Sequence, residues 1–399
     1  MKITLHRGQN QIGGSIIEVA SDTTKIILDA GSELDEEIPT APQIDGLFFG
    51  QATYDAVFIS HYHGDHLGLC DQVLPEIPIY IGKGAANVTN AARRYLNKPE
   101  YTFADYYESG KRIVIGDLCI IPYLCDHSAF DAYMFHISCG NKTLIYSGDF
   151  RSNGRKSFSR LLDDLPRADA LIVEGTTLSR VSKPSQTEAE LEQSAVEVIS
   201  KNDAPVFILQ AATNIDRLVT VFKAARRSDR ILLQDLYMTE VASAAGENIP
   251  NARTFSGVRV FITNGWNGRY ELLDSKYSKT KIGRAGIAKQ RFIMCVRPSM
   301  QSYLEKLAEE ISFNGGILFY SMWSGYKEKE DIRSFLQFMQ DQGVEIIDLH
   351  TSGHADAETI LKLINNVNPA YLIPVHTENA DWFEQSTNVL VIKEKTFSF

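Results

Sequence analysis

Three histidines and an aspartate fall within residues 61–66, which read His-Tyr-His-Gly-Asp-His. An apolar run directly before them predicts a buried strand. The alternation lets His61 and His63 point the same way, while Asp65 and His66 can turn toward a second position. This pattern is typical of two metal ions that share one loop, rather than of one closed structural zinc site. Imidazole and carboxylate ligands favour zinc, iron or manganese over calcium or magnesium.

Further residues that can bind a metal follow downstream, three of them at the ends of strand-like runs. His127 follows one apolar run, Asp149 closes a second, and His376 follows a third. His354 lies in a Ser-Gly-His-Ala segment. Loops at strand ends often carry functional residues on a rigid scaffold, so we expect these side chains to converge. The alternative is a loop that is rich in histidine by chance, and the downstream residues disfavour it.

After residue 174 the sequence alternates predicted helices with predicted strands. Thr187 and Glu190 form the pattern of a capping box, which predicts the start of a helix. An apolar run over residues 206–209 predicts a strand, and Asn214 can cap the helix that follows it. This alternation favours an α/β domain with parallel strands.

Taken in order, these motifs resemble the metal-binding series of the metallo-β-lactamase fold. The segment Asp29-Ala30-Gly31 resembles its first motif. Glu174 and the segments around His354 and His376 resemble motifs of its β-CASP branch, which processes nucleic acids. Within that branch, the sequence is most similar to the bacterial ribonuclease J family. The motifs run in the right order along almost the whole chain.

The resemblance implies an α/β fold, namely an αββα metallo-β-lactamase sandwich with an inserted α/β, β-CASP-like cap domain. We expect residues 1–180 to form the first segment of the metallo-β-lactamase domain. Residues 181–343 are the expected insert, and residues 344–399 are the expected returning segment. In the β-CASP branch the insert caps the active-site cleft.

The resemblance also implies two divalent metal ions, with zinc favoured and manganese as the alternative. It assigns seven metal ligands: His61, His63 and His127 for one ion, Asp65, His66 and His376 for the other, and Asp149 as the bridge. A bridging carboxylate suits a two-metal hydrolytic site, in which the ions lie about 3.5–4 Å apart.

Roles in catalysis, in support of the ligands and in substrate binding are also predicted. Asp65 and His354 are the predicted catalytic residues, and His354 would contact the scissile phosphate and protonate the leaving oxygen. Asp29 and Glu174 are predicted to accept hydrogen bonds from metal-bound imidazoles, with plain structural roles as the alternative. Two predicted substrate contacts complete the set, Ser352 and Arg217, although a surface salt bridge is an equal alternative for Arg217.

Charge gives a divided prediction about nucleic acid. The net charge of the 399 residues is −10, which argues against a nucleic-acid binder. Residues 251–300, however, hold ten basic and two acidic residues, with Trp266, Tyr270 and Tyr277 among them. Such a stretch can follow a phosphate backbone and stack bases, and a solvated basic surface is the alternative. We therefore expect single-stranded RNA as the substrate, with DNA as the alternative.

Composition also bounds the location. No apolar run approaches the ~20 residues of a spanning helix, so we expect no membrane association. The five scattered cysteines are odd in number and typical of free thiols in a reducing compartment, so a cytoplasmic protein is expected. The sequence leaves the oligomeric state open.

The leading functional prediction is therefore a metal-dependent ribonuclease, acting as an endonuclease or from the 5′ end. Two alternatives stay open. One is a dinuclear metallohydrolase of a small ester or nucleotide. It is favoured by the acidic net charge and by residues 320–325, which replace the Gly-Ser-Gln-Gly-type loop that handles substrate phosphate in the ribonuclease J family. The other is a non-catalytic nucleic-acid-binding subunit, although none of the seven predicted ligands is missing.

Overall fold

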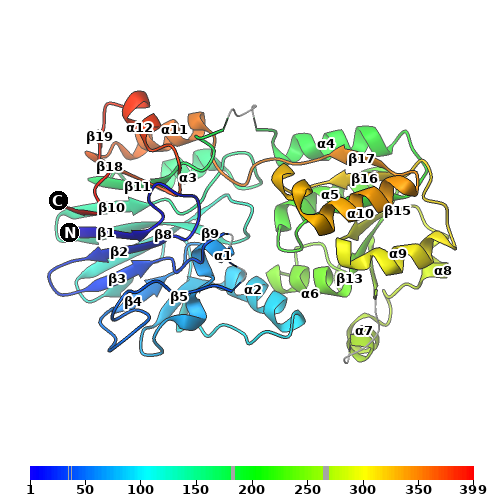
Figure 1. Cartoon of the computed structure of the whole chain (residues 1–399), viewed down its shortest axis with the longest axis horizontal. Helices are drawn as coiled ribbons and strands as arrows, with labels where there is room; N and C mark the ends of the chain where they lie inside the picture. The colour runs from blue at the N-terminus through cyan, green and yellow to red at the C-terminus, as the bar shows by residue number, and fades with distance from the viewer. Residues whose placement is uncertain (35, 37, 181–184, 264–268) are drawn as a thin grey trace. The chain divides into compact units, whose positions relative to one another are not determined.

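The computed structural model describes residues 1–34, 36, 38–180, 185–263 and 269–399 (Figure 1). The chain divides into two compact units. The first unit holds residues 1–90, 99–185 and 353–399, and the second holds residues 91–98 and 186–352. The predicted α/β fold class is confirmed, because the first unit holds two mixed sheets and the second holds an all-parallel one. The predicted domain boundaries stay a prediction.

The first sheet of the first unit has the strand order β20-β1-β2-β3-β4-β5-β6. Strands β1, β2 and β3 are antiparallel neighbours, whereas β3 to β6 run parallel. Strand β20 pairs with β1, which brings the two chain ends together (Figure 1). The bounds are β1 Lys2–Arg7, β2 Ile16–Ala20, β3 Lys25–Leu28, β4 Ala56–Phe58, β5 Ile79–Gly82, β6 Asp105–Tyr107 and β20 Thr396–Ser398.

The second sheet has the order β19-β18-β11-β10-β9-β8-β7. Strands β10, β11, β18 and β19 run parallel, and β7 to β10 are antiparallel. The carboxyl ends of β10, β11 and β18 therefore meet at one edge, which is where parallel sheets usually place functional loops. The bounds are β7 Ile113–Ile115, β8 Leu118–Cys125, β9 Ala132–Cys139, β10 Lys142–Tyr146, β11 Ala170–Glu174, β18 Tyr371–Val375 and β19 Leu390–Val391.

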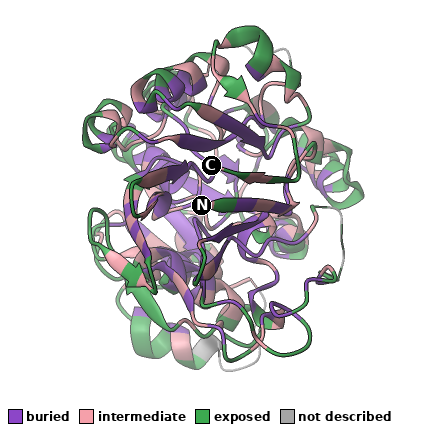
Figure 2. Cartoon of the chain, turned by 90° about the vertical axis from the view of Figure 1, so that its left-hand side faces the viewer, coloured by how far each residue is buried: buried purple, intermediate pink, exposed green. Residues whose placement is uncertain are grey.

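The two sheets pack face to face around one apolar core. Phe58 of the first sheet and Phe135 and Ile373 of the second belong to it. Because side chains alternate along a strand, Val173 and Leu372 point to the other face of the second sheet, where helices cover them. Figure 2 shows these strands as mainly buried, with exposed residues on the outer helices. The helices of this region are α1 Gly64–Leu67, η1 Cys70–Gln72, α2 Lys83–Tyr95, α3 Phe158–Asp164, α11 Ala357–Val367 and α12 Asp381–Ser386.

The second unit is built on a six-stranded sheet with the order β14-β13-β15-β12-β16-β17. All its strand pairs are parallel, as the alternation of helices and strands predicted. All strands except β17 at one edge are buried along most of their length, which is typical of a parallel sheet covered on both faces. The bounds are β12 Val206–Leu209, β13 Ile231–Asp235, β14 Val258–Phe261, β15 Phe292–Val296, β16 Ile317–Tyr320 and β17 Glu345–Asp348.

The helix starts of the second unit follow the predicted capping signals. Thr187 and Glu190 form the complete capping box of α4. The Asn214 side chain accepts a hydrogen bond from the backbone N–H of Arg217 at the start of α5. The bounds are α4 Glu188–Ile199, α5 Ile215–Arg227, α6 Leu236–Ala245, α7 Arg269–Tyr277, α8 Arg284–Ile287, η2 Pro298–Met300, α9 Gln301–Ala308, η3 Ser324–Glu328 and α10 Glu330–Asp341. Among the described residues, no helix is long and apolar enough to cross a membrane.

Candidate metal centre

The histidine-rich loop after β4 is held in place by its backbone. The carbonyl of Asp65 accepts a hydrogen bond from Ser15 N at 2.9 Å, and that of His66 accepts one from Ala30 N at 2.8 Å. Gly31 lies so close that a Cβ there would fall 1.7 Å from the Asp65 carbonyl oxygen. Only glycine fits this approach, which explains why a glycine ends the Asp-Ala-Gly segment.

Three imidazoles form the first group of candidate ligands. His61 Nε2 lies 3.2 Å from His63 Nδ1, and His127 Nε2 lies 3.1 Å from the same atom. His127 Nδ1 lies 2.5 Å from the carbonyl oxygen of Gly353 and must donate to it. His61 Nδ1 lies 3.1 Å from the hydroxyl of Ser60. Because the Ser60 hydroxyl donates to Asp29 Oδ2 at 2.8 Å, it accepts from His61 Nδ1. Nε2 of His61 and of His127 is then without a proton, which is the form that binds a metal.

The second group joins Asp65, His66, Asp149 and His376. His66 Nε2 lies 3.2 Å from Asp149 Oδ2, and His376 Nε2 lies 3.1 Å from Asp65 Oδ2. Asp149 Oδ2 also lies 3.8 Å from both His61 Nε2 and His376 Nε2. Asp149 therefore faces both groups. The structure brings all seven predicted ligands together, while their individual roles stay a prediction.

Unpaired polar atoms test whether these residues fit a metal. Within the described part of the chain, His66 Nε2 and both carboxylate oxygens of Asp149 are buried and make no well-oriented hydrogen bond, although His66 Nε2 and Asp149 Oδ2 lie only 3.2 Å apart. Buried polar atoms are nearly always hydrogen-bonded, so three orphans in one place need an explanation. A cation between them supplies one, since it binds lone pairs of imidazole and carboxylate. The donor set fits the predicted ions, with no preference between zinc and manganese.

The Asp29 carboxylate supports the loop from behind. His66 Nδ1 lies 2.8 Å from Asp29 Oδ2, Tyr146 donates its hydroxyl to the same oxygen at 2.6 Å, and Ser60 N donates to Oδ1 at 2.6 Å. Asp29 has a φ of 61°, a left-handed conformation that aspartate and asparagine adopt more readily than most residues. Such a carboxylate orients the imidazole and strengthens it as a ligand.

Glu174 reaches the imidazoles in a different way from Asp29. Its Oε2 lies 3.1 Å from His354 Nδ1 and accepts a hydrogen bond from the Thr176 hydroxyl at 2.6 Å. The Thr176 oxygen in turn lies 2.8 Å from His376 Nδ1. Glu174 therefore touches no predicted ligand imidazole directly and acts on His376 through Thr176. The sequence reasoning missed Thr176, whose only signal is its place just past the end of β11.

His354 differs from the other imidazoles in exposure. Its side chain is 24% exposed, whereas the side chains of Asp149 and Glu174 are 1% exposed. Its Nδ1 lies 3.5 Å from Asp149 Oδ2. Burial lowers the pKa of His354, but the Glu174 and Asp149 carboxylates outweigh this and raise it to about 9. A charged, solvent-reachable imidazole beside the ligands can contact an anionic substrate and give up a proton.

Burial sets the protonation state of three of the candidate ligand histidines. It lowers the pKa of His61 and of His127 well below the usual range, and that of His63 to about 4. These imidazoles are thus neutral near pH 7, as metal binding requires. His66 behaves oppositely, because the carboxylates of Asp149, Asp29 and Asp65 overcome burial and raise its pKa. A cation bound at His66 would therefore displace a proton.

Two segments of the sequence match known families. Residues 11–188 match the metallo-beta-lactamase superfamily, and residues 343–388 match the Zn-dependent metallo-hydrolase RNA specificity domain. The first segment contains six of the seven candidate ligands and the second contains His376. The chain belongs to the metallo-beta-lactamase superfamily.

Relatives of this metallo-beta-lactamase hydrolase include ribonucleases. A ribonuclease J from Sinorhizobium meliloti is 24% identical over 370 residues, which cover 88% of this chain and 62% of the relative. An RNase J-like protein from Methanocaldococcus jannaschii is 24% identical over 234 residues, 53% of each chain. A crystal structure of a protein of unknown function from Enterococcus faecalis V583 matches with a TM-score of 0.82 at 20% identity, over 99% of both chains. That structural match supports the fold alone.

The two predicted substrate contacts lie in the second unit of the hydrolase. Ser352 is partly exposed, and its role stays a prediction. Arg217 is fully buried, with Nε and Nη2 at 3.1 and 3.0 Å from the two carboxylate oxygens of Glu188. Its Nη1 donates to the carbonyl of Leu349 at 2.7 Å and to the hydroxyl of Ser321. This placement speaks against a phosphate contact by Arg217, since the guanidinium is buried and already occupied.

Carboxylates pair with half of the ten basic residues in the stretch over residues 251–300. Five of its basic residues form ion pairs: Lys276 with Glu240, Lys281 with Asp274, Arg284 with Glu310, Arg291 with Asp203 and Arg297 with Asp235. Tyr277 is buried, so it is not available to stack a base. Trp266 lies outside the described residues. Four of the five partner carboxylates come from outside the stretch, which is why counting within it overstated the local charge.

Proposed function

We propose that this hydrolase cleaves phosphodiester bonds of RNA with the aid of two divalent cations. One observation carries the proposal: the segment that matches an RNA specificity domain supplies both His354 and His376 to the candidate metal centre. The distant similarity to ribonuclease J supports the same substrate. The chain spans 62% of that relative's length, so the relative's substrate and direction of cleavage are only proposals for this chain.

Each ligand of the centre has a proposed role in holding one or both of the cations. When bound, the two cations supply a water of lowered pKa and positive charge for the phosphoryl oxygens. His61, His63 and His127 would hold one ion, Asp65, His66 and His376 the other, and Asp149 both. Zinc is the proposed metal, with manganese as the alternative.

His354 is the proposed proton donor to the leaving oxygen, and Asp65 is the second proposed catalytic residue as well as a proposed metal ligand. Glu174 fixes His354 through Nδ1 and keeps the imidazole charged. The other ring nitrogen, Nε2, can then donate its proton as the phosphodiester bond breaks. Glu174 is thus a positioning residue for His354.

We also propose a cytoplasmic location, because the five cysteines are all free.

Turnover of 5′-labelled single-stranded RNA with added zinc or manganese tests the proposal. His63→Ala should remove one ligand, reduce the metal content and lower cleavage by at least about 10³-fold, since the cations supply several kcal/mol. His354→Ala should keep the metal content and lose about 10²–10⁴-fold of the rate, as expected for a lost general acid. His136→Gln is the matched control, because His136 lies on β9 and belongs to none of the groups of candidate ligands.

The product ladder gives the polarity of cleavage, and labelled single-stranded DNA in parallel separates the two nucleic acids. If the protein holds about two metals per chain yet leaves both intact, the nuclease proposal fails. A hydrolase of a small ester or nucleotide then becomes the leading candidate, and the ion pairs formed by half of the basic residues in the stretch favour it. A protein that binds RNA but holds no metal would point to the non-catalytic alternative.

A further inference from the structure

The second unit holds a pocket that is separate from the metal ligands. It has a volume of about 270 Å³ and lies where β12, β13 and β15 end. Its lining includes Gln210, Asp235, Met238, Arg297 and Met300. The carboxyl ends of parallel strands are the usual place for a ligand in an open α/β sheet. The volume falls just below the range of drug-sized sites, so it suits a smaller ligand.

Gln210 is the feature that points to a ligand. Gln210 is one of the residues that line the pocket, it is only 5% exposed, and neither Nε2 nor Oε1 of its buried amide has a hydrogen-bond partner among the described residues. Leaving such an amide buried and unpaired costs about 1–3 kcal/mol. A ligand that offers one acceptor and one donor on the same edge would satisfy both atoms at once.

The charges of the pocket are already balanced. Arg297 Nη2 donates to Asp235 Oδ2 at 2.5 Å, and the Arg297 guanidinium lies 5.3 Å from the centre of the Tyr237 ring. The Asp235 carboxylate also accepts hydrogen bonds from the backbone N–H groups of Tyr237 at 3.3 Å and Met238 at 3.2 Å. A free anion would have to compete with Asp235 for Arg297, so the pocket favours a neutral polar ligand.

The rest of the wall is apolar and rich in sulfur. Met238, Cys295, Val296 and Met300 are 2–3% exposed and line the pocket. Methionine sulfur makes favourable contacts with aromatic rings, and its flexible side chain adapts to a flat ligand. A flat aromatic ring with a donor and an acceptor on one edge therefore matches the pocket.

We propose that this pocket binds a nucleobase, with Gln210 pairing with the base edge through its amide. The amide of glutamine reads base edges in this way elsewhere, by giving one hydrogen bond and accepting another. The inference rests on the proposed function only for the source of the base, which would be RNA. Binding of a single nucleoside requires neither the metal ligands nor cleavage.

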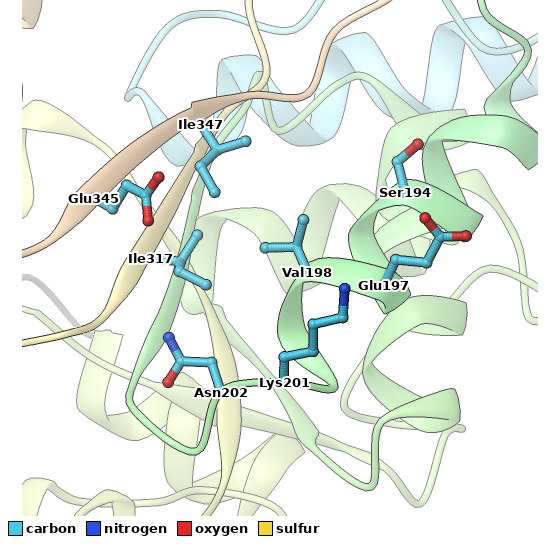
Figure 3. A pocket seen from close by; sticks show the side chains of 8 residues that line it. All are labelled: Ser194, Glu197, Val198, Lys201, Asn202, Ile317, Glu345 and Ile347. Carbon is cyan, nitrogen blue, oxygen red and sulfur yellow. The ribbon is translucent and has the colours of Figure 1, made fainter.

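Another hollow of the second unit lacks these features. It lies beside α4 and β17 and is lined by Ser194, Glu197, Val198, Lys201, Asn202, Ile317, Glu345 and Ile347 (Figure 3). Its charged side chains are exposed, and none of its lining residues carries an unpaired buried side-chain atom in the described part of the chain. The orphaned amide thus distinguishes the Gln210 pocket.

Titration of the full chain with adenosine, guanosine, cytidine and uridine, by calorimetry and ligand-observed NMR, tests the inference. At least one nucleoside should bind, and Gln210→Leu should weaken it by at least about tenfold, because two hydrogen bonds are lost. Gln210→Glu keeps the shape but removes the donor, so it should change which base binds best. Gln210→Leu should also raise the melting temperature of the ligand-free protein, since it removes an unpaired buried amide.

The thermal readout separates ligand binding from a structural role, because a glutamine that supports the fold would destabilise the protein when replaced. Gln290→Leu is the control, since Gln290 is exposed and does not line the pocket. Absence of binding by all four nucleosides overturns the inference, as does inorganic phosphate binding that Gln210→Leu leaves unchanged. The titration is repeated with the His63→Ala variant. Nucleoside binding should be unchanged there, because it requires neither the metal ligands nor RNA cleavage.

Discussion

The metal centre and the basic stretch of residues 251–300 both stood out in the sequence, yet their polar groups behave oppositely. In the metal centre, carboxylates and imidazoles are buried, and His66 and Asp149 keep buried atoms that no described residue satisfies. In the basic stretch, Lys281 and Arg291 are exposed and already paired with Asp274 and Asp203.

The difference shows which sequence signals predict the arrangement of residues in the folded protein. Spacing after strands carries three-dimensional information, because parallel strands bring their carboxyl ends to one edge. A charge count does not, because the partners of surface charges can come from distant segments. A local excess of +8 from ten basic and two acidic residues therefore says little about the field around the folded stretch.

The largest effect should come from Asp149, the residue that faces both ligand groups. Asp149→Asn keeps the shape but removes the charge, so we expect both ions to be lost and RNA cleavage to fall by at least about 10³-fold. Metal analysis of the dialysed protein, beside turnover, measures this. One ion retained per chain, with cleavage intact, would contradict the shared role of Asp149.

The next effect concerns Arg217, whose burial sets it apart from the paired surface charges. Arg217→Met should destabilise the protein by about 3–5 kcal/mol, because it leaves the Glu188 carboxylate buried without its cationic partner. Urea unfolding measures the change. The double variant Glu188→Leu with Arg217→Met should recover most of it. Lost RNA cleavage with unchanged stability would instead restore the predicted substrate contact.

A smaller effect should follow from the support behind His66. Asp29→Asn preserves the left-handed backbone at φ 61° but withdraws the charge from His66 Nδ1. Loss of such an outer partner typically lowers metal affinity by about 10–100-fold. Competition with a fluorescent zinc chelator measures it, and Asp55→Asn serves as the control because Asp55 is exposed. Equal affinities for the two variants would leave Asp29 with a purely structural role.

Much of the fold and of the candidate site could be predicted, because strand-end residues and helix caps are local signals. The strand over residues 206–209 and the caps at Thr187 and Asn214 are examples. The links between distant segments could not be predicted. No local sequence signal indicates that the Thr176 hydroxyl links Glu174 to His376.

Burial is the second property that the sequence did not reveal. Arg217 lies at a helix start, where a phosphate contact is a reasonable prediction, and only the packed structure reveals Glu188 beside it. The unpaired Gln210 amide could not be predicted either, because whether a side chain has a hydrogen-bond partner depends on its surroundings in the fold and not on its sequence neighbours.

The smallest effects should come from the basic stretch. Lys281 and Arg291 are exposed and paired, so the double variant Lys281→Gln with Arg291→Gln should change the free energy of unfolding by less than about 1 kcal/mol. It should also leave the salt dependence of RNA binding nearly unchanged, because paired cations release few counterions. If the stretch follows the RNA backbone, each lost contact would lower the slope of log Kd against log salt by about 0.7. The double variant Lys279→Gln with Lys289→Gln is the matched comparison, since both lysines are exposed and no ion pair is described for either. A slope that falls for this variant alone would locate the RNA contact at the unpaired lysines.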